Sequence, residues 1–285
     1  MSEQAQPVNE FAEREISMAE SEPGAGTPHY DRDFLLSAGK RNQVMALWEV
    51  EKFGTDSFGD PDYVAIYGMR PAEWYARGVR LLARTTLEAV RDQLGATIGL
   101  DVARKVADIP ASTPFGVIDP FAGSCNGLYW VLRHVPNATA RGFELDETVF
   151  GLTSRNLTLL GLDGQIQLIQ GDYRQLISKD FFPADHHLVV CLGPPWGDAL
   201  TPSAGLDLGR TRPPVGEIVD DFERVYPRNP VLYAVEAHER LVPGPLAVLR
   251  QKFTESDLQI YDVAAPHGRR AMLFGANRWP LPKTK

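Results

Sequence analysis

The chain has 285 residues, of which 44% are hydrophobic and 23% charged, so it is long enough to bury one sizeable core. We expect one catalytic domain with a short accessory segment. The net charge of −8 argues against a protein that holds duplex nucleic acid by neutralising its phosphates.

Neither a membrane span nor a secretory leader is expected. No apolar run approaches the roughly 18 residues of a transmembrane helix, and the N-terminus is acidic without an apolar segment. The chain is therefore predicted to be cytoplasmic and to contact no membrane, with its oligomeric state left open. Its two cysteines, Cys125 and Cys191, are too few for a disulfide framework or a cysteine-based metal site, so we predict reduced thiols and no bound metal.

The first 33 residues predict a disordered acidic tail. Residues 1–33 are rich in Glu, Ser, Pro and Gly and carry eight acids against two arginines. This composition buries too little apolar surface to fold, and it leaves the remainder of the chain close to neutral. An arm that docks a partner is the alternative interpretation.

Residues 34–110 predict an N-terminal helical extension. Helices are expected over 34–53, 72–94 and 99–107, where apolar residues recur at helical spacing. Pro71 suits the first turn of the second helix. Tyr63 and Tyr67 lie in the turn-rich connector before it, flanked by Gly and Pro.

Residues 111–285 alternate between strand and helix patterns, which predicts a Rossmann-like α/β core. Strands are expected over 115–119, 138–144, 166–170 and 187–192, with helices ending near 135 and covering 148–160. The next stretch, 197–216, is rich in Gly and Pro, and its length indicates a lid or a binding loop.

The C-terminal part predicts two further helices and three strands. The helices are expected around 217–226 and over Val231–Leu241, and the fifth strand at 243–251, P-G-P-L-A-V-L-R-Q. The strings L-Q-I-Y-D-V at 258–263 and R-A-M-L-F-G-A at 270–276 predict an antiparallel hairpin.

The stretch V-I-D-P-F-A-G-S-C-N, residues 117–126, is the first motif that carries chemistry. An apolar run ends in Asp119 and breaks into a small-residue turn just before a helical pattern. A buried strand followed by a tight turn and a helix N-terminus brings backbone N–H groups and a carboxylate to one point, where α/β sheets bind nucleotides. The spacing G-x-G-x-x-G is absent, so a dinucleotide site is not predicted.

The string D-P-F-A-G-S at 119–124 resembles the first motif of class I S-adenosylmethionine-dependent methyltransferases. G-P-P-W at 193–196 is similar to the [DN]-P-P-[YFW] motif of those that methylate nitrogen. The resemblance implies a Rossmann-like, mostly parallel sheet of seven strands that a C-terminal antiparallel hairpin closes. It also implies S-adenosylmethionine as the cofactor.

The acids at the ends of three successive predicted strands are the candidate cofactor ligands. Asp119 suits the amino-acid end of the cofactor, Glu144 the ribose hydroxyls and Asp172 the adenine amino group. Glu144 is preferred to Asp146, which suits the N-cap of the next helix. The predicted cofactor-binding residues are Asp119, Phe121, Ala122, Gly123, Asn126, Glu144, Asp172 and Tyr173.

The G-P-P-W motif is the candidate catalytic centre. The resemblance implies that the carbonyl of Pro194 accepts a hydrogen bond from the substrate and that Trp196 stacks on a substrate ring. Gly193 stands where the family has Asp or Asn, which removes one acceptor and favours a ring nitrogen over an exocyclic amine. The string G-P-P-W-G also resembles the D-P-P-W-G of trimethylguanosine synthases. The predicted substrate-binding residues are Pro195, Trp196, Asp198 and the lid candidates Tyr63 and Tyr67.

The leading hypothesis is an S-adenosylmethionine-dependent methyltransferase that acts on a nitrogen of a flat heteroaromatic small molecule. A nucleic-acid base N-methyltransferase is the first alternative, favoured by the order of the motifs and disfavoured by charge. A non-catalytic scaffold subunit that binds the cofactor is the second alternative, since Gly193 and Cys125 depart from the family pattern.

Overall fold

The computed structural model describes residues 29–201, 203–262 and 269–278 of the chain. Most of the predicted acidic tail, residues 1–28, lies outside the described residues. Residues 29–33, the remaining part of the predicted tail, are folded, so the predicted end of the tail at residue 33 is wrong. Tyr30 is buried, and Asp31 is the N-cap of helix α2 (Arg32–Leu36), where its side chain accepts a hydrogen bond from the backbone N–H of Phe34.

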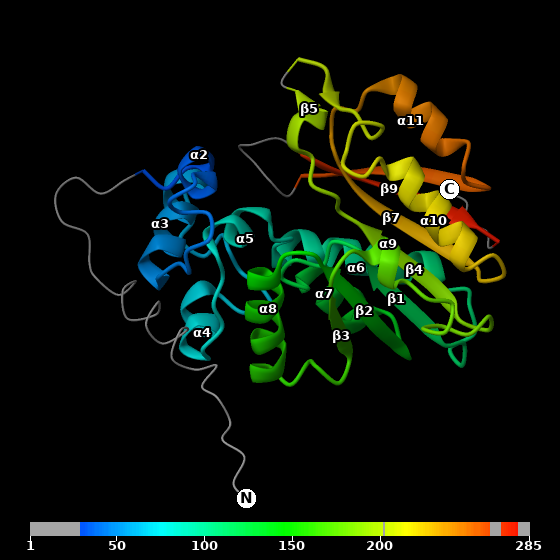
Figure 1. Ribbon diagram of the computed structural model, residues 1–285, viewed down its shortest axis with the longest axis horizontal. Coiled ribbons are helices and arrows are strands. Elements are labelled where there is room, and N and C mark those ends of the chain that lie inside the picture. Colours follow the sequence, from blue (N-terminus) through cyan, green and yellow to red (C-terminus); the bar gives the residue numbers. More distant parts are fainter. Residues whose placement is uncertain (1–28, 202, 263–268, 279–285) are drawn as a thin grey trace, which may run out of the picture. The chain divides into compact units, whose positions relative to one another are not determined.

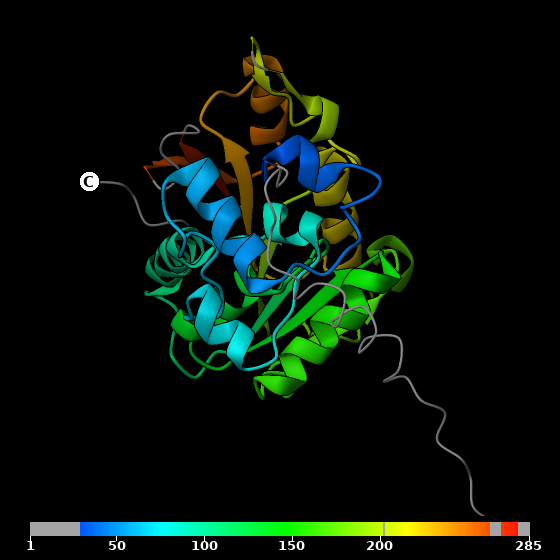
Figure 2. The same cartoon turned by 90° about the vertical axis from the view of Figure 1, so that its left-hand side faces the viewer.

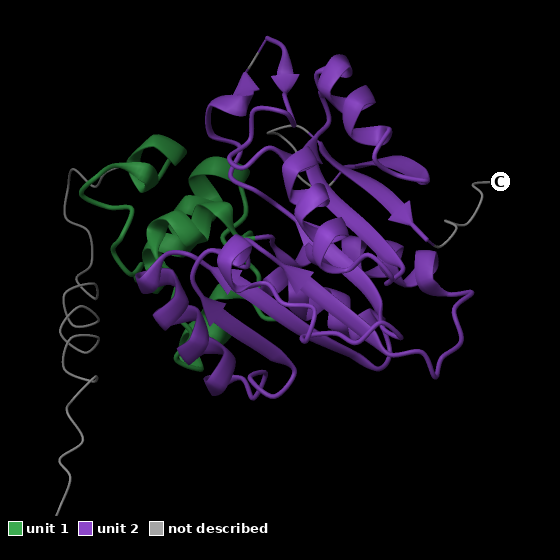
Figure 3. Ribbon diagram, turned by 45° about the vertical axis from the view of Figure 1, so that its right-hand side comes forward, with its two compact units in different colours: residues 1–89 green, residues 90–285 purple. Residues whose placement is uncertain are grey.

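The chain forms two compact units, residues 1–89 and residues 90–285 (Figure 3). The predicted extension to residue 110 therefore ends earlier. Helix α6 (Asp92–Val106) belongs to the second unit because it packs against helix α7 (Asn126–His134). The two helices approach closely, since a Cβ atom on Gly95 would lie only 2.5 Å from the side chain of Trp130.

The first unit is helical, but its helices are shorter than predicted. Besides α2 it contains α3 (Leu47–Phe58), α4 (Pro71–Ala76) and α5 (Ala83–Glu88). Gly78, at φ +83°, follows α4 and interrupts the helix predicted over 72–94. A buried ion pair of 2.5 Å joins Lys40 to Glu49, and the hydroxyl of Tyr30 also donates to Glu49. These polar groups fix the turn between α2 and α3.

The second unit is built on a seven-stranded sheet with the order β3-β2-β1-β4-β7-β9-β8 (Figure 1). The strands are β1 (Phe115–Asp119), β2 (Ala138–Glu144), β3 (Ile166–Gln170), β4 (His187–Leu192), β7 (Val231–His238), β8 (Glu255–Tyr261) and β9 (Arg270–Asn277). The first five are parallel, and β9 is antiparallel to both of its neighbours. The predicted mostly parallel sheet with a C-terminal hairpin is confirmed, and the first four strands have their predicted bounds.

The predicted helix over Val231–Leu241 and the predicted strand at 243–251 are both wrong. The first segment contains the central strand β7, and the second contains helix α11 (Pro243–Arg250). Strand β7 is almost entirely buried between β4 and β9, and tertiary burial overrides the helix propensity of its Ala and Glu residues. Pro243 occupies the first turn of α11, where its missing N–H costs nothing.

Apolar side chains alternate along the strands and pack against helices. Ile118, Val190 and Val235 belong to a buried cluster that also includes Ile218 of helix α10 (Val215–Val225). Helix α7 contacts β1 and β2, and helix α8 (Glu147–Leu159) runs beside β2 and β3 (Figure 2). Among the described residues, none of the helices is long and apolar enough to span a membrane.

The predicted loop at 197–216 is partly regular. It contains a single 3₁₀ turn, η1 (Gly197–Ala199), and a short antiparallel pair formed by β5 (Leu200–Thr201) and β6 (Gly205–Leu206). Gly205 has φ +90°, and a Cβ atom there would lie 2.4 Å from the carbonyl oxygen of Arg240, so the turn requires glycine. The stretch is thus fastened to the chain after β7.

Candidate functional site

The turn after β1 is a tightly bonded backbone loop. The carboxylate of Asp119 accepts a hydrogen bond from the N–H of Phe121 at 2.9 Å, and the N–H of Ala122 donates to the carbonyl of Phe143 on β2. Gly123 and Cys125 have φ angles of +47° and +59°. Cys125 therefore adopts the left-handed conformation that a glycine would take without cost.

Glu144 links the tips of β1 and β2. Its Oε2 atom accepts from the N–H of Gly123 at 3.1 Å, and its Oε1 atom accepts from the N–H of Asp146 at 2.8 Å. Asp146 is the N-cap of α8 and accepts from the N–H groups of Thr148 and Val149. The preference for Glu144 over Asp146 as a candidate ligand is consistent with this capping role, while ribose binding by Glu144 stays a prediction.

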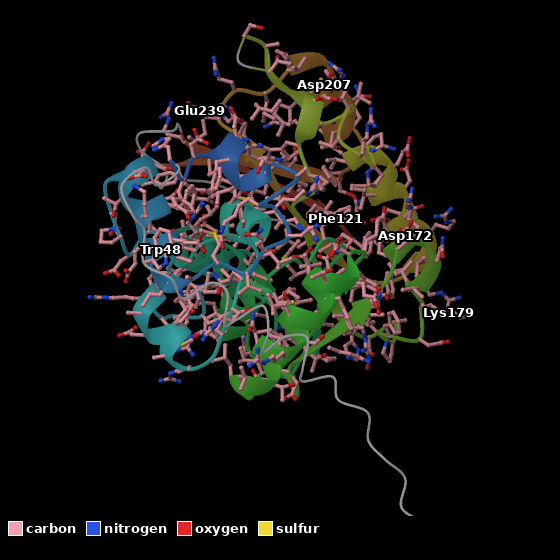
Figure 4. All side chains as sticks on the ribbon, turned by 60° about the vertical axis from the view of Figure 1, so that its left-hand side comes forward. Trp48, Phe121, Asp172, Lys179, Asp207 and Glu239 are labelled. Carbon is pink, nitrogen blue, oxygen red and sulfur yellow. The ribbon has the colours of Figure 1, made fainter. Side chains whose placement is uncertain are left out.

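Asp172 and Tyr173 lie at the tip of β3. Asp172 caps the short helix α9 (Tyr173–Leu176) and pairs with the guanidinium of Arg174 at 2.6 Å, which holds the pKa of that carboxyl below its usual value. The ring of Tyr173 is buried against Phe121, at 5.7 Å between centroids. Figure 4 shows Phe121 and Asp172 in the same region of the second unit. The hydroxyl of Tyr173 donates to Asp221 at 3.1 Å, and binding of the cofactor by Asp172 and Tyr173 stays a prediction.

Asn126 is directed away from the turn. It is fully buried at the start of α7, and its side-chain amide donates to the carbonyl of Val90 at 2.7 Å and to Oδ1 of Asp92 at 3.0 Å. The indole N–H of Trp130 donates to the same oxygen. The side chain of Asn126 therefore ties α6 to α7, and its backbone N–H donates to the hydroxyl of Ser124, so its role in binding the cofactor stays a prediction.

The G-P-P-W motif follows β4 directly. Gly193 and Pro195 are exposed, Pro194 is buried, and Trp196 is partly buried against the sheet cluster. The guanidinium of Arg270 lies over the indole ring of Trp196, with its Cζ atom 5.2 Å from the centroid. His238 meets the same ring edge-on at 6.2 Å. These two contacts fix the orientation of the indole.

A pocket of about 520 Å³ opens beside Trp196. It is lined by Pro195, Trp196, Gly197, Asp198, Gly209, Arg210, Thr211, Arg212 and Pro214. The predicted substrate residues Pro195, Trp196 and Asp198 are thus together. The arginines were not among the predicted site residues, although the string G-R-T-R-P-P at 209–214 concentrates positive charge close to the motif.

Three carboxylates gather on one face of the sheet. Side chains alternate between faces along a strand, and Ile118, Phe143 and Val235 point into the cluster on the opposite face. The residues next to them, Asp119, Glu144 and Glu236, therefore share the other face, at the carboxyl ends of β1, β2 and β7.

Electrostatics agree with this arrangement. Burial, with the carboxylates of Glu144 and Glu236 adding to it, raises the pKa of Asp119 to about 7. Burial also raises the pKa of Glu236, against the opposing effect of the guanidinium groups of Arg270 and Arg91. Among the described residues, no group of three or more His, Cys, Asp or Glu side chains has the geometry of a metal site.

Glu236 was missed because its strand was taken for a helix. The run V-L-Y-A-V-E-A-H follows a proline and holds two valines and a tyrosine, which suit a buried strand, but its two alanines and its glutamate favour a helix. The local pattern therefore leaves the element undecided. Both cysteines are free thiols, as predicted, and burial raises the pKa of each.

Tyr63 and Tyr67 belong to the first unit. The ring of Tyr63 stacks on Phe58 at 3.4 Å between centroids, and Tyr67 is buried at φ +56°. Both take part in the packing of that unit, and their role as a lid stays a prediction.

In the sheet, the five parallel strands are followed by the antiparallel strand β9 and then by β8. This strand order decides the fold class. This is a Rossmann-like fold with the sheet order that the resemblance to class I methyltransferases implied. Among similar solved structures, the METTL16 MTase domain is 14% identical, with a TM-score of 0.48, and the match covers 67% of this chain and 70% of that one. The N-terminal domain of human METTL16, in complex with SAH, is 16% identical, with a TM-score of 0.47 and coverage of 66% and 70%.

A third similar structure is a putative methyltransferase, yhhF, from Escherichia coli. It is 17% identical, with a TM-score of 0.39, and the match covers 64% of this chain and 87% of that one. No family model matches the sequence, and no curated protein does.

Proposed function

We propose that the protein is an S-adenosylmethionine-dependent methyltransferase that acts on a nitrogen of a flat heteroaromatic small molecule. The observation that carries the proposal is the meeting of the D-P-F-A-G-S turn and the G-P-P-W turn on adjacent strands. Strands β1 and β4 are paired in register from Phe115 and His187 onward, so Asp119 and the motif that begins at Gly193 emerge at the same edge of the sheet.

The residues at this edge fit the cofactor. S-Adenosylmethionine carries two cationic groups, an ammonium and a sulfonium, and a ribose diol. Asp119 is a partly buried carboxylate close to two others, so a cation beside it would relieve their mutual repulsion. Glu144 would accept from the ribose, and the backbone of Phe121, Ala122 and Gly123 would line the amino-acid end. When bound, the cofactor supplies an electrophilic methyl group that passes to a nitrogen lone pair while the carbon–sulfur bonding pair stays on sulfur.

The acceptor would lie on Trp196. Its indole is held by Arg270 and His238 and borders the pocket, and aromatic stacking would orient a flat ring. Apart from the chain neighbours of Gly193, Oε2 of Glu236 is the one atom of the described residues within 4 Å of the position that a Cβ atom on Gly193 would take. Open space thus remains above the motif, where the nitrogen has to lie about 3 Å from the methyl carbon.

The proposal is tested in two stages. Calorimetry with adenosylhomocysteine is expected to show binding to the full chain. Incubation of a small-molecule extract with labelled S-adenosylmethionine is then expected to give a labelled heteroaromatic product by mass spectrometry. Absence of binding would refute the cofactor assignment. Binding without labelling of any small molecule or nucleic acid would support the scaffold alternative instead.

A nucleic-acid base N-methyltransferase is the second candidate function. Arg210 and Arg212 line the pocket beside Trp196, and guanidinium groups next to a stacking platform suit a phosphate attached to a base. Labelling of total RNA that falls steeply with salt, and falls further in Arg210→Gln and Arg212→Gln, would favour this function over the first.

A further inference from the structure

Gly193 and Glu236 are neighbours in space although they lie far apart in the sequence. Strands β4 and β7 pair in parallel, and Leu192 is the register partner of Val235. Gly193 and Glu236 are the next residues on each strand. A Cβ atom built on Gly193 would lie 3.5 Å from Oε2 of Glu236, which is ordinary van der Waals contact. The carboxylate of Glu236 therefore borders the space that a side chain at 193 would enter.

Glu236 lacks a tight partner within the described part of the chain. Its nearest cation is Arg270, whose Nε atom lies 3.8 Å from Oε1, and no hydrogen bond to Glu236 is found among the described residues. By contrast, Glu239, three residues along the chain, holds Arg269 at 2.8 Å. The carboxylate of Glu236 is only partly buried, and its oxygens accept no hydrogen bond from the described residues, so they are able to accept from a ligand.

We propose that the carboxylate of Glu236 on β7 replaces the hydrogen-bond acceptor that the family has as Asp or Asn at the position of Gly193, after β4. The methylated nitrogen is then an amino group on the flat ring. The proposal rests on the proposed function and deepens it. The carboxylate of Glu236 and the carbonyl of Pro194 would accept from the two N–H bonds of one amine. The lone pair is then directed away from both acceptors, toward the methyl donor.

The proton balance follows from the same assignment. An amine that gains a methyl group becomes cationic and has to lose one proton to give the neutral product. The Glu236 carboxylate receives that proton through the hydrogen bond that it already accepts. A ring nitrogen without hydrogen would need neither the acceptor nor this transfer. The sequence-based preference for a ring nitrogen, which followed from the loss of an acceptor at Gly193, is thereby reversed.

The test compares the kcat/KM values of variants, with the fraction of the small-molecule extract that the wild-type protein labels as the substrate. Glu236→Ala is expected to lower kcat/KM by about 100-fold, since it removes both the acceptor and the base. Glu236→Gln keeps a carbonyl oxygen and is expected to lose about tenfold. Glu239→Gln, a matched glutamate paired outside the site, is expected to leave kcat/KM unchanged. Adenosylhomocysteine affinity is expected to remain within threefold in all three variants.

A relocation variant separates this role from a structural one. Gly193 has no positive φ angle, so aspartate is allowed there, and Gly193→Asp with Glu236→Ala would return the carboxylate to β4. This double variant is expected to recover at least about tenfold over Glu236→Ala, a gain that restored general-base catalysis readily supplies. The labelled product is expected to carry its methyl on a former amino group, as seen by mass spectrometry and NMR.

Three outcomes would overturn the inference while leaving the proposed function intact. They are wild-type turnover by Glu236→Ala, no recovery in a double variant that still binds adenosylhomocysteine, and a product methylated on a ring nitrogen that carried no hydrogen. A wild-type protein that neither binds adenosylhomocysteine nor transfers a methyl group would instead refute the proposed function itself.

Discussion

The two halves of the candidate site are held in different ways. At the tips of β1 and β2, backbone N–H groups occupy the carboxylates, as when Glu144 binds both Gly123 and Asp146. At the tips of β4 and β7, Gly193 is exposed, and within the described part of the chain Glu236 has only a long ion pair. Under the proposed function, the tips of β1 and β2 form the cofactor half, whose groups are already held by the fold. The tips of β4 and β7 form the acceptor half, which the substrate would complete. Substitutions in the first half should therefore change binding of the cofactor, and those in the second should change turnover.

The largest expected effect is that of Glu144→Ala. It removes acceptors for the N–H groups of Gly123 and Asp146 and for the ribose, and charged hydrogen bonds contribute about 1.5–3 kcal/mol each. We expect adenosylhomocysteine to bind about 100-fold more weakly by calorimetry, with a lower Tm. Glu147→Ala, an exposed glutamate in the first turn of α8, is the control and should leave the affinity unchanged. Wild-type affinity in Glu144→Ala would contradict the assignment of the cofactor half.

Trp196→Ala is expected to separate the two halves most clearly. Loss of the stacking platform should lower kcat/KM by about 30-fold, since stacking on an aromatic ring contributes about 1–3 kcal/mol. Adenosylhomocysteine affinity should remain within threefold, because no predicted cofactor contact is lost. Trp196→Phe keeps a flat face and should recover most of the rate. Equal losses of cofactor affinity and turnover in Trp196→Ala would mean that the halves are not independent.

The pH dependence of cofactor binding tests Asp119. Its pKa of about 7 is raised by burial and by Glu144 and Glu236, and opposed by the N–H of Phe121. The ionised form binds an ammonium, so affinity should rise as pH increases through about 7 and level off above it. Between pH 6 and pH 8 we expect the affinity of the wild-type protein to rise about tenfold more than that of Asp119→Asn. Comparison with this variant removes the contribution of the ligand's own titration. Parallel pH profiles for the two proteins would remove Asp119 from the site.

Asp198→Asn should have the smallest effect. Asp198 lines the pocket but is exposed, and exposed charges contribute about 0–1 kcal/mol. We expect kcat/KM to change by less than about twofold, the size of effect typical of such surface positions. A tenfold loss of kcat/KM would instead assign the general base to Asp198, next to the G-P-P-W turn, and not to Glu236 on β7.

Much of the cofactor half was predictable from local sequence. The strands at 115–119 and 138–144 end in Asp119 and Glu144, and Asp172 lies two residues beyond the strand at 166–170. The carboxyl ends of neighbouring parallel strands lie at one edge of a sheet, so these acids were expected there. The helices of the first unit were less predictable. Their ends depend on single residues such as Gly78, whose positive φ angle the apolar pattern does not reveal.

The sequence by itself determined that Asp119 and Glu144 end successive strands and that a G-P-P-W turn follows the fourth. Only the tertiary structure decided that β7 is a strand, because its alanine and glutamate favour a helix until burial between β4 and β9 outweighs that preference. Register in the sheet then brought Glu236 next to Gly193. Because strand pairing joins segments that are distant in the chain, no local pattern contains that contact.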